Sequence, residues 1–283
     1  MAQRPSPTVR RRRLAEQLRR LRKAAGISLE DAAEHLDISH SALSRIETGQ
    51  ATARTAYVDT LARLYGVDDR QREALVRLAR EARQRGWWHP YNDVLNDQYA
   101  AYISFETEAV SIRTYEPQTV PGLLQTEAYA RALVTAQLPE ASADQVDKRV
   151  QLRMERQARV RSDDPLRLWV ILGEPVLRYQ VGGLDAMRQQ LEHLLEVGER
   201  PHTTIQVLPY SAGAHPGMGG PFVILGFEDS ADVVYLENLT SSVYLEADSE
   251  VAQYTLTYEH LRAAANNREQ SGQLIQRALR ELK

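Results

Sequence analysis

The 283-residue sequence contains no cysteine, which excludes a disulfide framework and any metal site built on thiolates. This absence is typical of proteins in a reducing compartment. The sequence also has no apolar run near the ~18 residues that a membrane-spanning helix needs. Its N-terminus is polar and basic, without the apolar core of a secretory signal. We therefore expect a soluble, cytoplasmic protein with no membrane segment.

The motifs of common enzyme classes are missing as well. HExxH, GxSxG and dinucleotide-binding fingerprints do not occur. The glycine-rich stretch 213–220 lacks the lysine and the spacing of a phosphate-binding loop, and the histidines are scattered without metal-ligand spacing. Glu174 precedes a turn where a general acid could lie, but the sequence identifies no partner for it. We expect no catalytic residue, no metal site and no cofactor.

Charge is distributed unevenly along the chain. Residues 1–86 hold 18 Lys and Arg against 11 Asp and Glu, a net charge of +7, whereas residues 87–283 hold 17 against 27, a net charge of −10. The first 25 residues contain nine basic side chains and one acidic side chain, Glu16. A basic N-terminal region attached to an acidic remainder favours contact of the N-terminal region with phosphate groups. A solvated charge run is the alternative interpretation of such an arginine-rich stretch.

The stretch 26–50, GISLEDAAEHLDISHSALSRIETGQ, has the pattern of two short helices joined by a tight turn. Ser28 followed by Asp31 is typical of a helix N-terminus, and Ser39 is a second N-cap candidate. Apolar residues recur at helical spacing after each cap: Leu29, Ala32, Ala33 and Leu36, then Ala42, Leu43 and Ile46. This pattern predicts a helix-turn-helix, whose second helix enters the major groove of DNA.

Polar side chains form the outer face of the second predicted helix. An arginine there can donate two hydrogen bonds to guanine, and histidine and serine can bind bases or phosphates. We expect base contacts from His40, Ser41, Ser44 and Arg45. We expect phosphate contacts from Arg10, Arg11, Arg12, Arg13, Ser28 and Ser39. A helical hairpin inside a larger bundle is the alternative, which the double cap and the polar outer face disfavour.

Helical periodicity continues on both sides of this motif. It predicts helices over residues 10–25, 55–65 and 69–85, after a disordered arm at residues 1–9. The N-terminal domain, residues 1–86, is therefore expected to be mainly α and to contain five helices.

Residues 87–283 have a different pattern. Helical stretches come first, with one strand expected among them at residues 110–115, and short apolar strands follow from Leu168 onward, so we expect an α+β domain. Residues 149–161 are dense in arginine, and the helical period places their apolar residues on a separate face. We interpret the arginines as a solvated helix face and not as a second nucleic-acid site.

The run SLEDAAEHLDISHSALSRIETGQ resembles the Cro/C1-type (XRE-like) helix-turn-helix domain of phage repressors and many bacterial regulators. The resemblance implies a five-helix domain whose base-reading positions match His40, Ser41 and Arg45, with Ser44 close by. It also implies structural roles for Glu47 and Gly49. Several relatives carry Gln where this chain has Leu29, so phosphate anchoring is expected from other residues. Because relatives read inverted-repeat operators as homodimers, we expect a homodimer.

The second region also resembles a known domain. The motifs WWHPYN, YISFETEA, VPGLLQTEAYARAL, RMERQ, GEPVLRYQVGG and GGPFVILGF are similar to the C-terminal domain of a large actinobacterial family of helix-turn-helix regulators. That domain is described as antitoxin-like and is otherwise of unknown function. The resemblance covers nearly the whole chain after Arg85. It implies a transcription regulator that is often paired with a small protein encoded nearby.

These observations leave two functional hypotheses. In the first, the protein is a sequence-specific transcription regulator whose acidic domain binds a small protein partner or a ligand. The expected binding surfaces contain Leu123, Tyr129, His215 and Gly217, with the loop from His215 to Gly220 closing over a bound molecule. Alternatively, such apolar residues fill the core. In the second hypothesis, the protein is an enzyme that the helix-turn-helix tethers to DNA.

Overall fold

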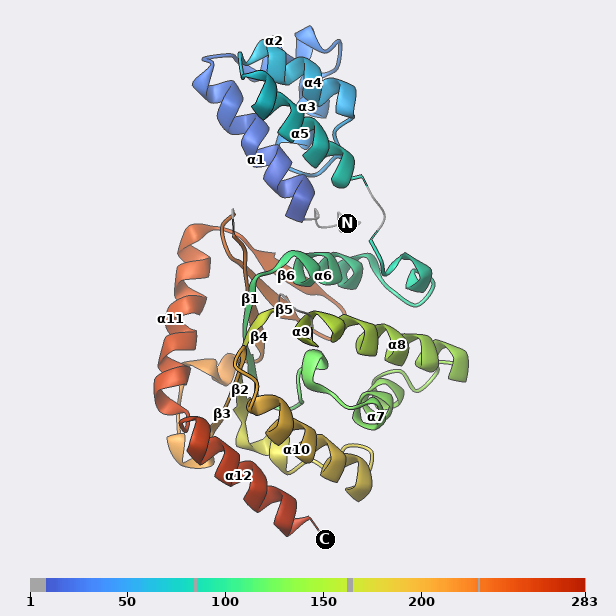
Figure 1. The fold of residues 1–283 in the computed structure, drawn as a ribbon, viewed down its shortest axis with the longest axis vertical. Coiled ribbons are helices and arrows are strands. Elements are labelled where there is room, and N and C mark those ends of the chain that lie inside the picture. The colour runs from blue at the N-terminus through green and yellow to red at the C-terminus, as the bar shows by residue number, and fades with distance from the viewer. Residues whose placement is uncertain (1–8, 84–85, 162–164, 229, 283) are drawn as a thin grey trace. The chain divides into compact units, whose positions relative to one another are not determined.

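The computed structural model describes residues 9–83, 86–161, 165–228 and 230–282 of the chain (Figure 1). The predicted arm, except for Val9, lies outside the described residues. Contacts between Cα atoms divide the chain into two compact units. The first comprises Met1–Pro90 and Asn96–Glu108, and the second comprises Tyr91–Leu95 and Ala109–Lys283. The N-terminal unit thus includes the helix at Asp97–Glu108, although we expected the first domain to end at residue 86.

The first unit is entirely helical in its described residues. Its helices are α1 (Val9–Ala24), α2 (Leu29–His35), α3 (His40–Glu47), α4 (Thr55–Leu64), α5 (Asp69–Glu81) and α6 (Asp97–Glu108). One apolar core joins the first five helices, and its fully buried side chains include Leu18, Ala32, Leu43, Val58, Leu61 and Ala79. The prediction of a mainly α domain with five helices in residues 1–86 is confirmed.

Both helices of the central motif begin at the serines that the sequence predicts. The Ser28 Oγ atom accepts a hydrogen bond from the Asp31 amide at 3.0 Å, and the Ser39 Oγ atom accepts one from the Ala42 amide at 3.2 Å. Between the helices, Asp37 adopts the left-handed conformation with φ = 52°. Aspartate is among the few residues that tolerate this conformation, so the chain turns sharply without a glycine.

A buried ion pair connects α1 to α3. The Arg22 side chain donates through Nε and Nη2 to the Glu47 carboxylate at 2.8 and 2.9 Å, and through Nη1 to the Ile27 carbonyl at 2.9 Å. The two side chains are only 12% and 4% exposed. The hydrogen bonds that Arg22 donates to the Glu47 carboxylate raise the pKa of Arg22. The structural role that the resemblance implies for Glu47 is therefore to fix the end of α3 against α1.

The second unit contains a six-stranded mixed sheet with the strand order β3-β2-β1-β4-β5-β6. The strands are β1 (Ser111–Glu116), β2 (Arg167–Gly173), β3 (Thr203–Leu208), β4 (Phe222–Gly226), β5 (Val233–Glu237) and β6 (Ser242–Leu245). Strands β1, β2 and β3 are parallel, whereas β1 pairs with β4 in the antiparallel direction. The carboxyl ends of the three parallel strands therefore meet at the edge where β4 begins.

Helices cover both faces of this sheet, as the ribbon shows (Figure 1). The crossover helices α7 (Glu127–Gln137), α8 (Ala143–Arg156), α9 (Ala158–Arg161) and α10 (Leu184–Gly198) lie on one face, and α11 (Asp248–Ala264) lies on the other. The last helix, α12 (Arg268–Glu281), contacts β3 and α10. The α+β class predicted for this region is confirmed. Among the described residues, no helix has the length and apolar character needed to cross a bilayer.

The arginine-rich helix departs from the expectation of a solvated face. Arg156 is buried, with 6% of its surface exposed, and Arg153 is half-buried. Arg153 donates from Nη1 to the Gln125 side-chain oxygen at 2.9 Å. The prediction was wrong for these two residues because the helix turns them towards the loop after β1, where side-chain and backbone oxygens replace water.

Glu47→Ala should lower the local stability of the first unit by about 3 kcal/mol, because it leaves the buried Arg22 guanidinium without its carboxylate. The matched control is Arg63→Ala, which removes an exposed ion pair with Asp59 and should cost less than about 1 kcal/mol. Amide hydrogen exchange of α1 and α3 in the full chain measures both effects. If the amide protons of α1 and α3 exchange at the same rates in the two variants, the role assigned to the ion pair is contradicted.

Candidate nucleic-acid interface and ligand cavities

The predicted base-contacting residues lie together on the outer side of α3. His40, Ser41 and Arg45 are exposed, and Ser44 is half-buried between them. Residues at these spacings occupy one side of a helix, because each residue advances by about 100°. The opposite side carries Leu43, which is fully buried. The structure therefore brings the four predicted residues together on a helix that its other face anchors in the core.

The predicted phosphate contacts are placed in three different settings. Ser28 and Ser39 are exposed helix caps, as described above. Arg10 forms an ion pair with Glu108 at 2.6 Å between Nη2 and Oε1. The remaining three, Arg11, Arg12 and Arg13, are half-buried, and burial lowers the pKa of Arg11. The Arg10 side chain is thus already paired with the Glu108 carboxylate. The two serine side chains are exposed to solvent, and each also accepts a hydrogen bond from a backbone amide of its helix.

Two motifs of the second unit meet in a buried polar network that the sequence motifs did not predict. Gln157 donates from Nε2 to the carbonyl oxygens of Gly122 and Gln125 at 3.1 and 2.7 Å. Gln125 donates to the Val120 carbonyl at 2.6 Å, and the Val120 amide donates to the Tyr129 hydroxyl at 3.2 Å. These bonds hold the loop after β1 against the end of α8.

A signal for this network was present in the helical spacing of α8. Val146 and Val150 are buried, and residues three and seven positions after Val150 share their face of the helix. Those residues are Arg153 and Gln157. A polar pair on a buried helical stripe predicts a polar partner inside the fold, but only the tertiary structure identifies the loop that supplies it.

Leu123 and Tyr129 are core residues and not an accessible surface. Leu123 is 6% exposed and Tyr129 is fully buried, with its hydroxyl accepting the Val120 amide. The expectation that they form a partner-binding surface is therefore wrong. The reason is that η2 (Gly122–Leu124) and the start of α7 turn these side chains inward, while polar positions face solvent.

Gly217 lies instead at the border between two cavities, and His215 lines the second of them. The loop segment η5 (Pro216–Gly219) separates them, and Gly217 lines both. A Cβ atom at Gly217 would lie 2.8 Å from the Tyr115 ring and 2.9 Å from Leu261 Cδ1. Such distances leave no space for a side chain, so glycine is required where the loop packs against β1 and α11.

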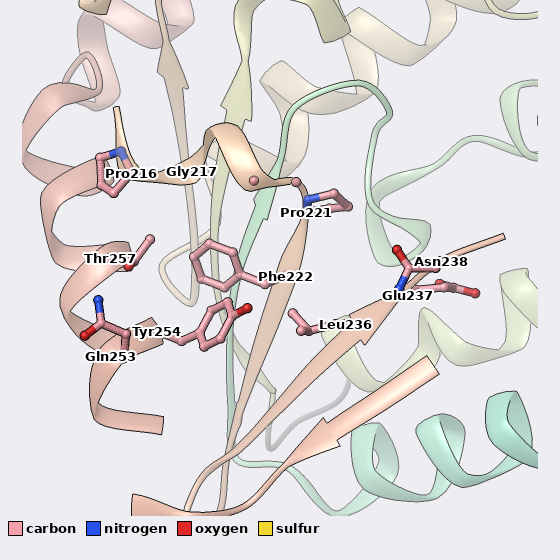
Figure 2. Close-up of a pocket in the computed structure, with 12 residues that line it drawn as sticks. Pro216, Gly217, Pro221, Phe222, Leu236, Glu237, Asn238, Gln253, Tyr254 and Thr257 are labelled. Carbon is pink, nitrogen blue, oxygen red and sulfur yellow. The ribbon is translucent and has the colours of Figure 1, made fainter. Parts of the chain in front are cut away.

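The first cavity, of about 310 Å³, lies between this loop, β5 and α11 (Figure 2). Phe222 and Tyr254 pack edge to face in its floor, with ring centroids 5.1 Å apart. Figure 2 shows Leu236 beside these rings and Glu237 with Asn238 at the far end. This cavity is therefore apolar at its floor and polar at one end.

The second cavity, of about 550 Å³, lies on the other side of the loop. It contains residues from the ends of all three parallel strands, Tyr115, Gly173 and Leu208. Glu174, whose sequence position is compatible with a general acid, makes a structural contact here. Its Oε2 atom accepts a hydrogen bond from the Tyr210 amide at 2.9 Å, which fixes the wall of this cavity.

The two glutamates at the ends of β1 and β5 differ from ordinary surface carboxylates. Burial raises the pKa of Glu116 to about 8, although Thr114 donates a hydrogen bond to it at 3.1 Å and the residue as a whole is half-buried. Burial also raises the pKa of Glu237, and Arg156 and Arg153 oppose this rise. Glu116 is therefore held in its neutral form near neutral pH.

This raised pKa predicts that stability falls with increasing pH. Between the usual pKa of 4.5 and about 8 the folded protein keeps Glu116 protonated while the unfolded chain ionises it, so stability is fully present below pH 4.5 and is lost towards pH 8. Glu116→Gln should therefore stabilise the protein by roughly 1–3 kcal/mol at pH 8 and by much less at pH 5. Thermal unfolding at both pH values measures this. Glu192→Gln, at an exposed position of α10, is the control, and a pH-independent gain for Glu116→Gln would contradict the assignment.

Comparison with known protein families gives two matches. A helix-turn-helix domain matches residues 13–75, from α1 into α5. A domain of unknown function (DUF5753) matches residues 99–277, from α6 to α12. No curated protein and no solved structure matches the chain. Because the second match covers more than half of the 283 residues, this chain belongs to the DUF5753 family, and it carries a helix-turn-helix domain in front of that domain.

Proposed function

We propose that the protein is a sequence-specific transcription regulator of the Cro/C1 type that reads its operator with α3. The observation that carries this proposal is the exposed polar face of His40, Ser41 and Arg45 on a helix whose inner face is buried. The matched helix-turn-helix domain and the net charge of +7 over residues 1–86 support it. Arg45 donates to guanine in this proposal, while the serines at the helix caps contact phosphates.

The second unit acts as the control domain of this regulator. It binds a small protein partner or a ligand, as in the antitoxin-like regulators that the sequence resembles, and this binding changes the affinity for DNA. Its net negative charge disfavours a direct contact with phosphate, and its cavities offer enclosed binding volume. Such control requires a coupling free energy, typically about 1–3 kcal/mol, that acts equally in both directions.

Catalysis is not part of the proposed function. The competing hypothesis of a DNA-tethered enzyme needs a general acid or base with a reaction partner. Glu174 was the single candidate named from sequence, and its carboxylate accepts the Tyr210 amide and lies 3.6 Å from Arg178. These contacts support a structural role for Glu174.

Arg45→Ala should reduce specific operator affinity by about 1–3 kcal/mol and leave binding to scrambled DNA nearly unchanged, because it removes a base contact. Arg70→Ala, at an exposed position of α5 outside the recognition face, serves as the control. Footprinting of the upstream region identifies the operator, and titrations at two salt concentrations measure both affinities. Equal losses on operator and scrambled DNA would rule out base recognition by Arg45.

The protein should bind its operator as a homodimer. A single short recognition helix reads too few base pairs to select one site in a genome, and two-fold symmetry doubles the sequence that is read. Light scattering of the free chain and of its operator complex should give two chains per inverted repeat. One chain bound to each operator would contradict this prediction.

A further inference from the structure

The 550 Å³ cavity lies where open sheets of this type bind ligands. Strands β1, β2 and β3 end at its wall with Tyr115, Gly173 and Leu208. In the strand order β3-β2-β1-β4-β5-β6, the chain adds β2 and β3 on one side of β1 and then β4 to β6 on the other side, so the strand order reverses at β1. Crevices at the carboxyl ends of strands beside such a change are the usual ligand sites of open sheets. The volume also falls within the roughly 300–1,000 Å³ of small-molecule sites.

The cavity wall is rigid and apolar. A proline stands beside each strand end that forms it: Pro117 after β1, Pro175 after β2, Pro209 after β3 and Pro221 before β4. Proline fixes its own φ angle, so these segments lose little freedom when a ligand binds. Tyr210 and Met218 also line the cavity while 62% and 72% exposed. Exposed large apolar side chains around a cavity are typical of a site that covers them with an apolar ligand.

No lysine, arginine, aspartate or glutamate is among the described residues that line the cavity, and hydrogen-bonding groups are few. Among its side chains, Gln118, Tyr115, Tyr210 and His215 can form hydrogen bonds. The His215 ring packs edge-on against Tyr115, with centroids 5.8 Å apart. Its Nδ1 atom is buried and has no hydrogen-bond partner among the described residues. Because Nδ1 is closed to solvent, a ligand in the cavity can bond this ring only through its other nitrogen, Nε2.

We propose that this cavity binds an uncharged, aromatic small molecule that carries a hydrogen-bonding group for His215. Tyr115, Tyr210 and the proline rings provide flat surfaces for stacking. An anion such as a phosphate would find no lysine or arginine among the described lining residues. A protein partner would need a surface of about 800 Å² on each side, whereas this site is a compact hollow. The inference rests on the proposed function in one respect, since it names the ligand of the control domain.

The probe for this site is N-phenyl-1-naphthylamine, a neutral aromatic molecule whose fluorescence increases in an apolar environment. The full chain should bind it saturably, with one site per chain, and should bind the anionic 1-anilinonaphthalene-8-sulfonate at least ~10-fold more weakly. Gln118→Trp, at the exposed rim, fills the cavity and should weaken the neutral probe by ~10-fold or more. His215→Asp places a charge in the wall and should have the same effect.

Gln151→Trp is the matched control, since Gln151 is an exposed glutamine on α8 outside the cavity lining. Loss of probe binding in both cavity variants, with the control unchanged, supports the site. No saturable binding, equal binding of the anionic probe, or binding that neither cavity variant weakens overturns it. Operator affinity measured with and without the neutral probe separates the two proposals. Binding without a change in operator affinity supports the site and counts against control through it, whereas the Arg45→Ala test does not depend on the probe.

Discussion

The contact on which the candidate DNA interface depends is the buried ion pair between Arg22 and Glu47. It joins α1, the longest helix of the basic region, to the end of α3, with both side chains nearly inaccessible to water. A buried charge is tolerated only when its partner is held in place, so this pair requires α1 and α3 to keep one relative position. The two serine caps fix where α2 and α3 begin. Contacts at the inner face and at both ends of α3 therefore fix the direction in which its outer face points.

In the second unit, the parallel arrangement of β1, β2 and β3 determines where the larger cavity lies. Parallel strands need crossover helices, and these bring all three carboxyl ends to the same edge of the sheet. The loops that leave this edge form the larger cavity, and Gly217 packs the incoming loop tightly against Tyr115. Glu116 lies at the same edge, where burial keeps its carboxyl group neutral near pH 7. The hydrogen bonds that Gln157 and Arg153 donate hold the loop after β1 against the end of α8.

The functions proposed for the two units have different physical requirements. The DNA recognition proposed for the first unit needs exposed, hydrogen-bonding side chains on a rigid helix, and α3 exposes His40, Ser41 and Arg45 within a region of net charge +7, residues 1–86. The control function proposed for the second unit needs a site whose occupation changes the free energy of DNA binding, and this unit contains cavities of about 310 and 550 Å³. The family match from residue 99 includes α6, which belongs to the first unit by its contacts. The family domain and the compact unit therefore do not have the same boundary.

The sequence by itself determined the features that depend on local chemistry. Caps at Ser28 and Ser39, apolar stripes and strand patterns were enough for the helix-turn-helix, the α+β class and the outer face of α3, because each arises from neighbours within a few residues. Tertiary structure alone decided the inward orientation of Leu123 and Tyr129, the burial of Arg156 and the site at the sheet edge. Those features join segments far apart in the chain, such as Gln125 with Gln157 and Tyr115 with His215. Periodicity states which side of a helix is apolar, but it does not state which distant segment covers that side.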